Sequence, residues 1–290
     1  MPIQIQGFKH DPKLVEIHAV NQKAGVVDSY RHVAPVVDTD CYMDWLRQLV
    51  GNKRARFVTA RITGDLLDQE DKLLARYRAD AIINATGLSA YDLAADLTVT
   101  PLRGALIRVV NDGSKFPKVK EALAVSHDDS HGKDAEDIVF IVPRNDKTLI
   151  LGGMYILILH MGSRVLNCKF PQGLVQPHVY SLDLTLDSPE IVRMRERCNN
   201  FVPGLENAEL DPVPLVQGLR PFRGSNVRVE REIRLKKDGS ASHIIHSYGQ
   251  GGSGFTLSFG CATDVLNLVM DLEAEIPWSK TVIPMLRANM

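Results

Sequence analysis

The segment His246-Ser247-Tyr248-Gly249-Gln250-Gly251-Gly252-Ser253-Gly254-Phe255-Thr256 predicts a strand, a glycine-rich turn and the start of a helix. Glycines let a backbone approach a ligand closely, and a helix N-terminus offers free N–H groups to an anion or a polar ring edge. The glycine spacing also matches a dinucleotide-binding pattern, but that pattern belongs to a βαβ unit with an acidic residue about 20 residues later. Two interpretations stay open: a loop that contacts a cofactor, or glycines that only allow a strand and a helix to pack tightly.

A second strand and turn are predicted at residues 79–88, where Ile82-Ile83-Asn84 leads into the small residues Ala85-Thr86-Gly87. Ser89 follows as a candidate N-cap for the next helix. A short apolar strand that enters a helix through small residues is typical of a buried parallel strand. A plain strand–helix turn without a ligand is an equal alternative.

Other elements are predicted on both sides of these segments. Asp40 is a candidate cap for a helix over residues 41–50 that ends at Gly51. Further helices are expected over residues 65–75, 188–200 and 255–273, and strands over residues 57–62, 104–110, 138–142, 148–153, 227–235 and 242–248. No helix separates the strands between residues 104 and 153, so we expect them to pair antiparallel.

Composition excludes several classes of protein. The 290 residues carry 34 Lys and Arg against 35 Asp and Glu, a net charge of -1, which argues against nucleic-acid binding. The four cysteines are scattered without metal-ligand spacing, and His243 and His246 are interpreted as strand residues, so no metal site is expected. We expect a cytoplasmic protein without a membrane partner, because the sequence begins without a signal-peptide pattern and residues 154–159, its longest apolar run, are too short to span a bilayer.

Arginines gather between residues 217 and 232, at Arg220, Arg223, Arg228 and Arg231. A guanidinium can hold a carboxylate through two parallel hydrogen bonds and so fix the orientation of an acidic ligand. Taken singly, each of these arginines is better explained as a member of a surface ion pair than as a ligand-binding group.

Taken together and in order, these stretches resemble the FAD-dependent D-amino-acid oxidase family over residues 24–275. The matching pieces are Ile83-Asn84-Ala85-Thr86-Gly87-Leu88, Pro101-Leu102-Arg103-Gly104, Phe140-Ile141-Val142-Pro143-Arg144 with Leu151-Gly152-Gly153, Gly218-Leu219-Arg220-Pro221 with Val229-Glu230-Arg231-Glu232, and His246 to Gly252. Each piece is weak alone, and the ordered set is specific.

The resemblance implies an α/β (α+β) fold, in which a partial FAD-binding, Rossmann-like layer is interleaved with an antiparallel-sheet substrate domain. Residues 1–100 would then form an incomplete FAD-binding α/β part. Residues 101–240 would form the substrate domain, with an insertion near residues 155–174. Residues 241–290 would supply the returning strand, the glycine-rich loop and a helix.

The chemistry implied by the resemblance is the oxidative deamination of a D-amino acid to a 2-oxo acid, with FAD as cofactor, dioxygen as oxidant, and release of ammonia and hydrogen peroxide. Arg220 would bind the substrate carboxylate, and the backbone of Gly252 would accept a hydrogen bond from the substrate amine. The flavin would be lined by Thr86, Gly87, Gly251, Gly252, Ser253, Gly254, Phe255 and Thr256, with Ile62 on the adenosine side. A homodimer is compatible with the resemblance, as is a peroxisomal location, although the C-terminal Arg287-Ala288-Asn289-Met290 is not a peroxisomal tripeptide signal.

Three features depart from the family pattern. Residues 1–25 lack the Gly-x-Gly-x-x-Gly turn that cradles the FAD pyrophosphate, so we expect the central parallel strand and the phosphate site to be missing. Phe140 stands where the family usually has a substrate-binding tyrosine, and phenylalanine cannot donate a hydrogen bond. Residues 155–174 read as an insertion, for which we hypothesise intron read-through together with a mis-assigned first exon.

Three functional hypotheses follow. The first is an oxidase of the D-amino-acid oxidase type. The second is an inactive, truncated remnant of such an oxidase that is unable to hold FAD and exposes an unpaired sheet edge. The third, a nicotinamide dehydrogenase, rests on the glycine spacing alone and lacks both the βαβ unit and the acidic ribose partner.

Overall fold

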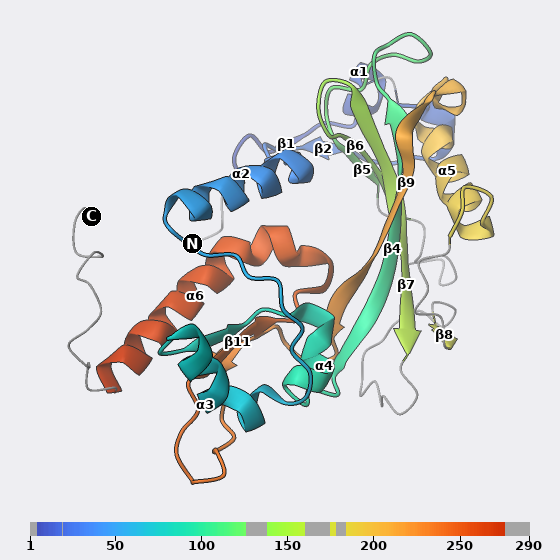
Figure 1. Cartoon of the computed structure of the whole chain (residues 1–290). Helices are drawn as coiled ribbons and strands as arrows, with labels where there is room; N and C mark the ends of the chain where they lie inside the picture. The colour runs from blue at the N-terminus through green and yellow to red at the C-terminus, as the bar shows by residue number, and fades with distance from the viewer. Residues whose placement is uncertain (1–4, 19, 126–137, 160–174, 178–183, 276–290) are drawn as a thin grey trace.

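The computed structural model describes residues 5–18, 20–125, 138–159, 175–177 and 184–275. A long antiparallel sheet stands beside a smaller mixed sheet, and helices cover faces of both (Figure 1). This arrangement confirms the predicted α/β (α+β) class.

The larger sheet has the strand order β5-β6-β7-β4-β9, with β8 paired to β7. Its strands are β4 (Val99–Val110), β5 (Leu123–Val125), β6 (Val139–Pro143), β7 (Thr148–Leu159), β8 (Val175–Pro177) and β9 (Leu210–Arg223). The pairs along the order are antiparallel, as predicted, and β8 alone among the described strands of this sheet runs parallel to its neighbour β7.

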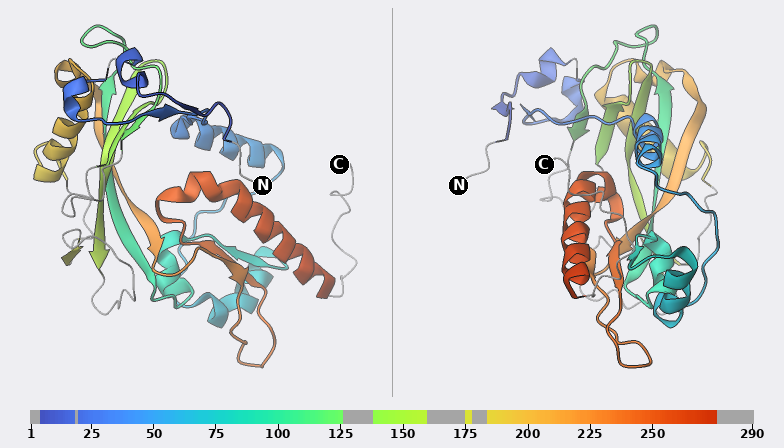
Figure 2. Two further views of the ribbon diagram at one scale, coloured as in Figure 1. Left: turned by 180° about the vertical axis from the view of Figure 1, so that it is seen from behind. Right: turned by 60° about the vertical axis from the view of Figure 1, so that its left-hand side comes forward.

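One face of this sheet forms the main hydrophobic core. Every second residue of β4 is buried on it, from Ala105 through Ile107 to Val109, as expected for a strand with alternating faces. Helix α5 (Pro189–Phe201) covers this face and contributes Ile191 and Met194, which are almost fully buried. The helix begins as predicted, with Ser188 at the N-cap and Pro189 in its first turn. The opposite face of the sheet looks toward α2 (Thr39–Asn52) and α6 (Gly254–Glu275) (Figures 1 and 2).

Strand β9 was not predicted, although it carries the arginine-rich segment. It contains Pro212, Pro214 and Pro221, which cannot donate backbone hydrogen bonds and therefore argue against a strand in sequence. The strand is nevertheless 14 residues long, because it lies at the edge of the sheet and pairs with β4 alone among the described strands. An edge strand tolerates proline where the missing N–H would face away from its neighbour.

The smaller sheet has the order β10-β11-β3, formed by β10 (Arg228–Arg231), β11 (Ile244–Tyr248) and β3 (Ile82–Asn84). Strands β3 and β11 are parallel, as predicted for residues 79–88, but β3 is not the buried strand expected there, since Asn84 is its one buried residue and Ile83 is 43% exposed. Helices α3 (Leu66–Tyr77) and α6 lie on opposite faces of this sheet (Figure 2). Leu66 and Leu73 of α3 pack with Ile244 of β11 in a small core that includes Leu93 of α4 (Ala90–Leu93).

Several local predictions are corrected by the structure. Residues 57–62 were predicted as a strand but have no regular structure. Helix α2 is capped by Asp38 rather than Asp40, since the Asp38 carboxylate accepts hydrogen bonds from the N–H groups of Asp40 and Cys41, and the helix passes through Gly51. Ser89 stands at the N-cap position of α4, but its side chain makes no capping hydrogen bond.

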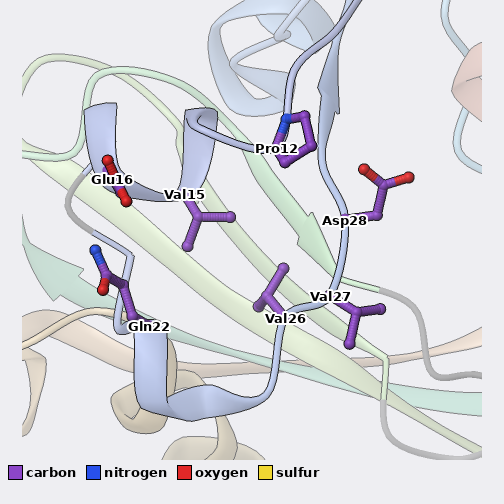
Figure 3. A pocket seen from close by; sticks show the side chains of 7 residues that line it. All are labelled: Pro12, Val15, Glu16, Gln22, Val26, Val27 and Asp28. Carbon is purple, nitrogen blue, oxygen red and sulfur yellow. The ribbon is translucent and has the colours of Figure 1, made fainter.

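The N-terminal segment forms short elements: β1 (Lys9–His10), α1 (Leu14–Ile17), a 3-10 turn at Gln22–Ala24 and β2 (Tyr30–Arg31), which pairs with β1. A hollow of about 190 Å³ lies between these elements (Figure 3) and is lined by Pro12, Val15, Glu16, Gln22, Val26, Val27 and Asp28. None of these residues belongs to the predicted site.

Two further expectations concern segments that the structure describes in part. The predicted insertion near residues 155–174 begins as the continuation of β7 to Leu159, and residues 160–174 lie outside the described residues. The segment Gly251–Ala274, almost all of it α6, is long and apolar enough to cross a membrane by length and composition alone. A single helix of this kind is weak evidence, so the expected absence of a membrane partner stays a prediction.

Candidate functional site

The guanidinium of Arg220 lies against the backbone of β4 on the sheet face that looks away from the main core. Arg220 pairs with Leu102 across the β9–β4 ladder, and Gly104 pairs with Gly218. A Cβ atom built on Gly104 would lie 1.6 Å from Nη1 of Arg220. Gly104 therefore provides the space that the arginine head group occupies.

The Arg220 guanidinium has no hydrogen-bond or ion-pair partner among the described residues, which sets it apart from neighbouring arginines in sequence. Arg223 binds Asp96 at 2.8 Å, and Arg228 binds Glu230 at 2.7 Å. Burial alone lowers the pKa of Arg220 from its ordinary value. A half-buried guanidinium without a counter-charge is unfavourable unless a ligand supplies one, so this position is suited to an anionic group.

The substitution Gly104→Ala is expected to displace the Arg220 head group with little loss of stability, because the atom that must move is the end of a flexible side chain. Ligands that bind through a carboxylate should lose about tenfold in affinity, as expected when a charge-assisted hydrogen bond is weakened. Calorimetric titration with a small carboxylate such as acetate measures the affinity, and thermal unfolding measures the stability. Unchanged affinity would contradict the placement of Arg220 over Gly104.

The glycine-rich turn lies directly beside Arg220. Residues Gly251–Ser253 form a 3-10 turn after β11, and α6 begins at Gly254. A Cβ atom on Gly252 would lie 3.6 Å from Cδ of Arg220, and Gln250 forms a β-bridge with Phe222 of β9. The end of β9 and the N-terminus of α6 thus meet at one place, and Arg220 and Gly252 lie side by side there.

The turn after β3 reaches the same place. Gly87 has a φ of +60° and begins a 3-10 turn at Gly87–Ser89. A Cβ atom on Gly87 would lie 3.5 Å from the ring of Pro221, the residue that follows Arg220. Thr86 and Gly87 are therefore close to the end of β9, although they are separated from it by more than 130 positions in sequence.

The structure places other predicted site residues on the elements around Arg220. Phe140 pairs with Gly152 of β7 and is 43% exposed on the Arg220 side of the sheet, since its neighbours Val139 and Ile141 face the main core. Phe255 lies in the first turn of α6, and its ring centroid is 6.2 Å from that of Tyr42 in α2 in an edge-to-face arrangement, a contact that sequence reasoning missed. Ser253 and Thr256 flank this position.

Ile62 was predicted in a strand near the adenosine side of the cofactor. It is 38% exposed in a segment without regular structure. A run of β-branched and aromatic residues forms a strand only where a neighbour accepts its backbone hydrogen bonds. None of the described strands pairs with residues 57–62, so the predicted strand is wrong.

A buried network behind the turns was also missed by sequence reasoning. His246 of β11 is fully buried and lies between Asn84 of β3, at 3.2 Å, and Glu232, also at 3.2 Å. Glu232 also accepts hydrogen bonds from Arg234, at 2.6 Å, and Arg234 in turn contacts Asp65. Burial and the nearby Arg228 charge lower the pKa of His246. The acidic and basic residues between positions 228 and 234 were the only signal of this network in sequence.

Stability should depend on pH through Glu232. Burial is the largest single effect and opposes its ionisation, but the hydrogen bonds from the Arg234 side chain and backbone, the Arg234 charge and the hydrogen bond from His246 together outweigh it and lower the pKa from 4.5 to about 2. Because the folded pKa is the lower one, the contribution is complete above pH 4.5 and is lost as the pH falls toward 2. Glu232→Gln should cost about 2–3 kcal/mol at pH 7 in urea unfolding, and the difference from the parent chain should shrink between pH 4.5 and 2. A difference that does not vary with pH would contradict this assignment.

The turns fit one end of a flavin cofactor. A Cβ atom on Gly254 would meet nothing within 4 Å, so the first turn of α6 is open on that side. Gly251 has a φ of +55°, a conformation that favours glycine. Its backbone lies beside Phe222, where a Cβ atom would be 3.5 Å from the Phe222 ring. Glycine backbone and free helix N–H groups are suited to hydrogen-bonding the polar edge of a planar ring.

Comparisons with known proteins identify relatives over most of the chain. A family model described as FAD dependent oxidoreductase matches residues 16–268. The D-amino-acid oxidase of Dictyostelium discoideum is 29% identical over 250 residues, which cover 84% of this chain and 57% of that protein. The D-amino acid oxidase of Dugesia ryukyuensis is 32% identical over 193 residues, covering 66% of this chain and 46% of the relative.

The chain thus spans about half of the length of these curated relatives. Among solved structures, glycine oxidase from Bacillus cereus ATCC 14579 is similar with a TM-score of 0.47 and 14% identity, covering 70% of this chain and 45% of that one. The match of the family model extends over the two strand–turn segments, Gly104, Arg220 and the glycine-rich turn. The chain belongs to the FAD-dependent oxidoreductase family that includes the D-amino-acid oxidases.

Proposed function

We propose that this chain acts in the FAD-dependent oxidative deamination of D-amino acids to 2-oxo acids, with release of ammonia and hydrogen peroxide. The observation that carries the proposal is Arg220, a half-buried guanidinium without a partner among the described residues, held over Gly104 and beside the glycine-rich turn. An α-amino acid presents a carboxylate that matches this charge.

The residues have separate tasks in this proposal. Arg220 binds and orients the substrate carboxylate through its guanidinium. The Gly252 carbonyl accepts a hydrogen bond from the substrate amine, and Thr86, Gly87, Gly251, Ser253, Gly254, Phe255 and Thr256 contact the cofactor. When bound, FAD supplies the redox chemistry, accepting a hydride and passing electrons to dioxygen. The protein holds the α-carbon in one orientation, which removes much of the entropic cost of the reaction.

Flavin binding is the first test. The purified chain is incubated with FAD, separated from free flavin by gel filtration, and its visible absorption is recorded. Flavin bands that co-elute with the protein, followed by peroxide release on addition of D-amino acids but not L-amino acids, are the expected result. Co-eluting flavin without peroxide release from any D-amino acid would contradict the proposed reaction.

A tyrosine in place of Phe140 is expected to strengthen substrate binding. Phe140→Tyr adds a hydroxyl on the half-exposed Arg220 side of the sheet, and a phenol can donate a hydrogen bond to a carboxylate where phenylalanine cannot. We expect KM for D-amino acids to fall by about tenfold, the effect of one hydrogen bond to a charged group. Steady-state peroxide assays measure this change. A KM that stays the same or rises would place Phe140 outside the substrate site.

The second candidate is a chain that does not retain FAD by itself. Two observations favour it. Strand β3 pairs only with β11 among the described strands, and Ile83 on it is 43% exposed. Large apolar residues of α6 are also exposed, with Phe259 at 74% and Leu266 and Met270 at 57%. Colourless protein after FAD incubation, with aggregation that increases with concentration, would support this candidate over the oxidase.

A further inference from the structure

His246 occupies the centre of a buried chain of hydrogen bonds that ends at Thr86, in the turn that follows β3. The chain runs from Glu232, through His246 and Asn84, to Thr86, and three of these four residues are buried. It therefore links the segment after β10 to β11, to β3 and to the exposed turn that follows β3.

The orientation of the Asn84 amide is fixed by the hydrogen bonds that its oxygen accepts. Its Oδ1 accepts a hydrogen bond from the Thr86 hydroxyl at 2.7 Å and another from the Thr86 N–H at 3.2 Å. The amide nitrogen must then be the group that faces His246, and an amide nitrogen only donates. Nδ1 of His246, at 3.2 Å, must accept this hydrogen bond and cannot carry a proton.

The other ring nitrogen is fixed by a carboxylate. Nε2 of His246 lies 3.2 Å from Oε2 of Glu232, which is itself held by Arg234 at 2.6 Å and faces Arg228 at 3.8 Å through Oε1. The Glu232 carboxylate is ionised and can only accept. A neutral imidazole with its proton on Nε2 satisfies both neighbours, and no other protonation state of the ring does so.

We propose that His246 is a positioning residue, which holds Asn84, and through it the Thr86–Gly87 turn, in the conformation that receives the flavin. This inference rests on the proposed function for its cofactor, but the hydrogen-bond chain exists without it. Removing the acceptor at Nδ1 leaves the Asn84 amide buried and unpaired, and the amide is then free to turn away from Thr86.

The proton arrangement is tested first, without FAD. Long-range 1H–15N NMR of the chain labelled at histidine nitrogens distinguishes protonated from unprotonated ring nitrogens, and His246→Gln assigns the signal. The expected result is a proton on Nε2 and none on Nδ1 at pH 7. A proton on Nδ1, or a doubly protonated ring, would overturn the proposal.

The mechanical link is tested by amide hydrogen exchange, also without FAD. His246→Gln should speed exchange at the Thr86 N–H by about tenfold, because that N–H loses a fixed acceptor. His243→Gln is the matched control: His243 lies three residues earlier, is only partly buried and bonds only the Asp80 carbonyl through its ring, so the Thr86 exchange rate should not change. If His246→Gln does not fold, Asn84→Ala tests the same link from the other side. Equal Thr86 exchange rates in the parent chain and in the variant would overturn the proposal.

FAD affinity then separates this proposal from the proposed function. His246→Gln and Thr86→Val should each weaken FAD binding by about tenfold, and the double variant should be weaker by less than the product, because both act through one turn. Effects that multiply, or a lowered Tm with unchanged FAD affinity, would overturn the positioning role. A parent chain that binds no FAD would contradict the proposed function, while the NMR and exchange results would still decide whether His246 holds the turn.

Discussion

Replacing Arg220 by methionine is expected to lower kcat/KM for D-amino acids by about 100- to 1000-fold, the effect of removing one partner of a buried charged pair. The loss should appear mainly in KM, because the guanidinium binds the substrate carboxylate in the ground state as well as in the transition state. The same change should not lower Tm and should raise it slightly. In the free protein the Arg220 charge is half-buried without a partner among the described residues, so methionine removes an unfavourable burial.

Two comparisons make the Arg220 result specific. Arg220→Lys keeps the charge but not the planar pair of donors, and should lose less activity than the methionine variant. Arg223→Met removes an arginine three residues away that already binds Asp96 at 2.8 Å, so its main effect should be a lower Tm. Reduced stability of Arg220→Met together with unchanged KM would show that Arg220 is a structural residue and would remove the main support for the proposed function.

The elements that could be predicted from the sequence are those with strong local signals. Ser188-Pro189 predicts the start of α5, the helix predicted over residues 65–75 is α3, and the apolar strand before Thr86 pairs in parallel with β11. Each signal depends on residues within a few positions of one another, where capping and periodicity operate. The glycine-rich turn belongs to the same group, since a strand, a 3-10 turn and a helix follow in order.

The features that could not be predicted depend on neighbours that are distant in sequence. Strand β9 could not be predicted because it contains three prolines, which a strand tolerates only where it lies at the edge of a sheet. Residues 57–62 have strand composition but no partner among the described strands. His246 carries no local signal of its role, because its partners Asn84 and Glu232 lie 162 and 14 positions away. The role of Arg220 came from the resemblance, and the space over Gly104 became visible only in the structure.

Replacing Gly153 by alanine is expected to destabilise the fold by about 4 kcal/mol or more, a large fraction of the stability of an ordinary domain. Gly153 lies in a β-bulge: β7 uses three steps from Leu151 to Met154 where β4 uses two from Ile107 to Ala105. Its φ is +124°, in a region that side chains rarely adopt. A Cβ atom there would lie 1.7 Å from the Ile138 carbonyl oxygen, a backbone atom that cannot move without shifting the start of β6.

Gly218→Ala is the matched control for this effect. Gly218 is also a glycine within a long strand of the same sheet, but its φ is not positive and a Cβ atom on it would meet nothing within 4 Å. Its cost in urea unfolding should be under about 1 kcal/mol, the range of an unstrained surface change. The bulge sets the register between β7 and β4, so Gly153→Ala should also shift Leu106, which packs over Gly152 on the Arg220 face of the sheet. The variant molecules that still fold should therefore bind D-amino acids with lower affinity. Equal unfolding midpoints for the Gly153 and Gly218 variants would mean that the bulge relaxes at no cost and that β4 is not held in place by it.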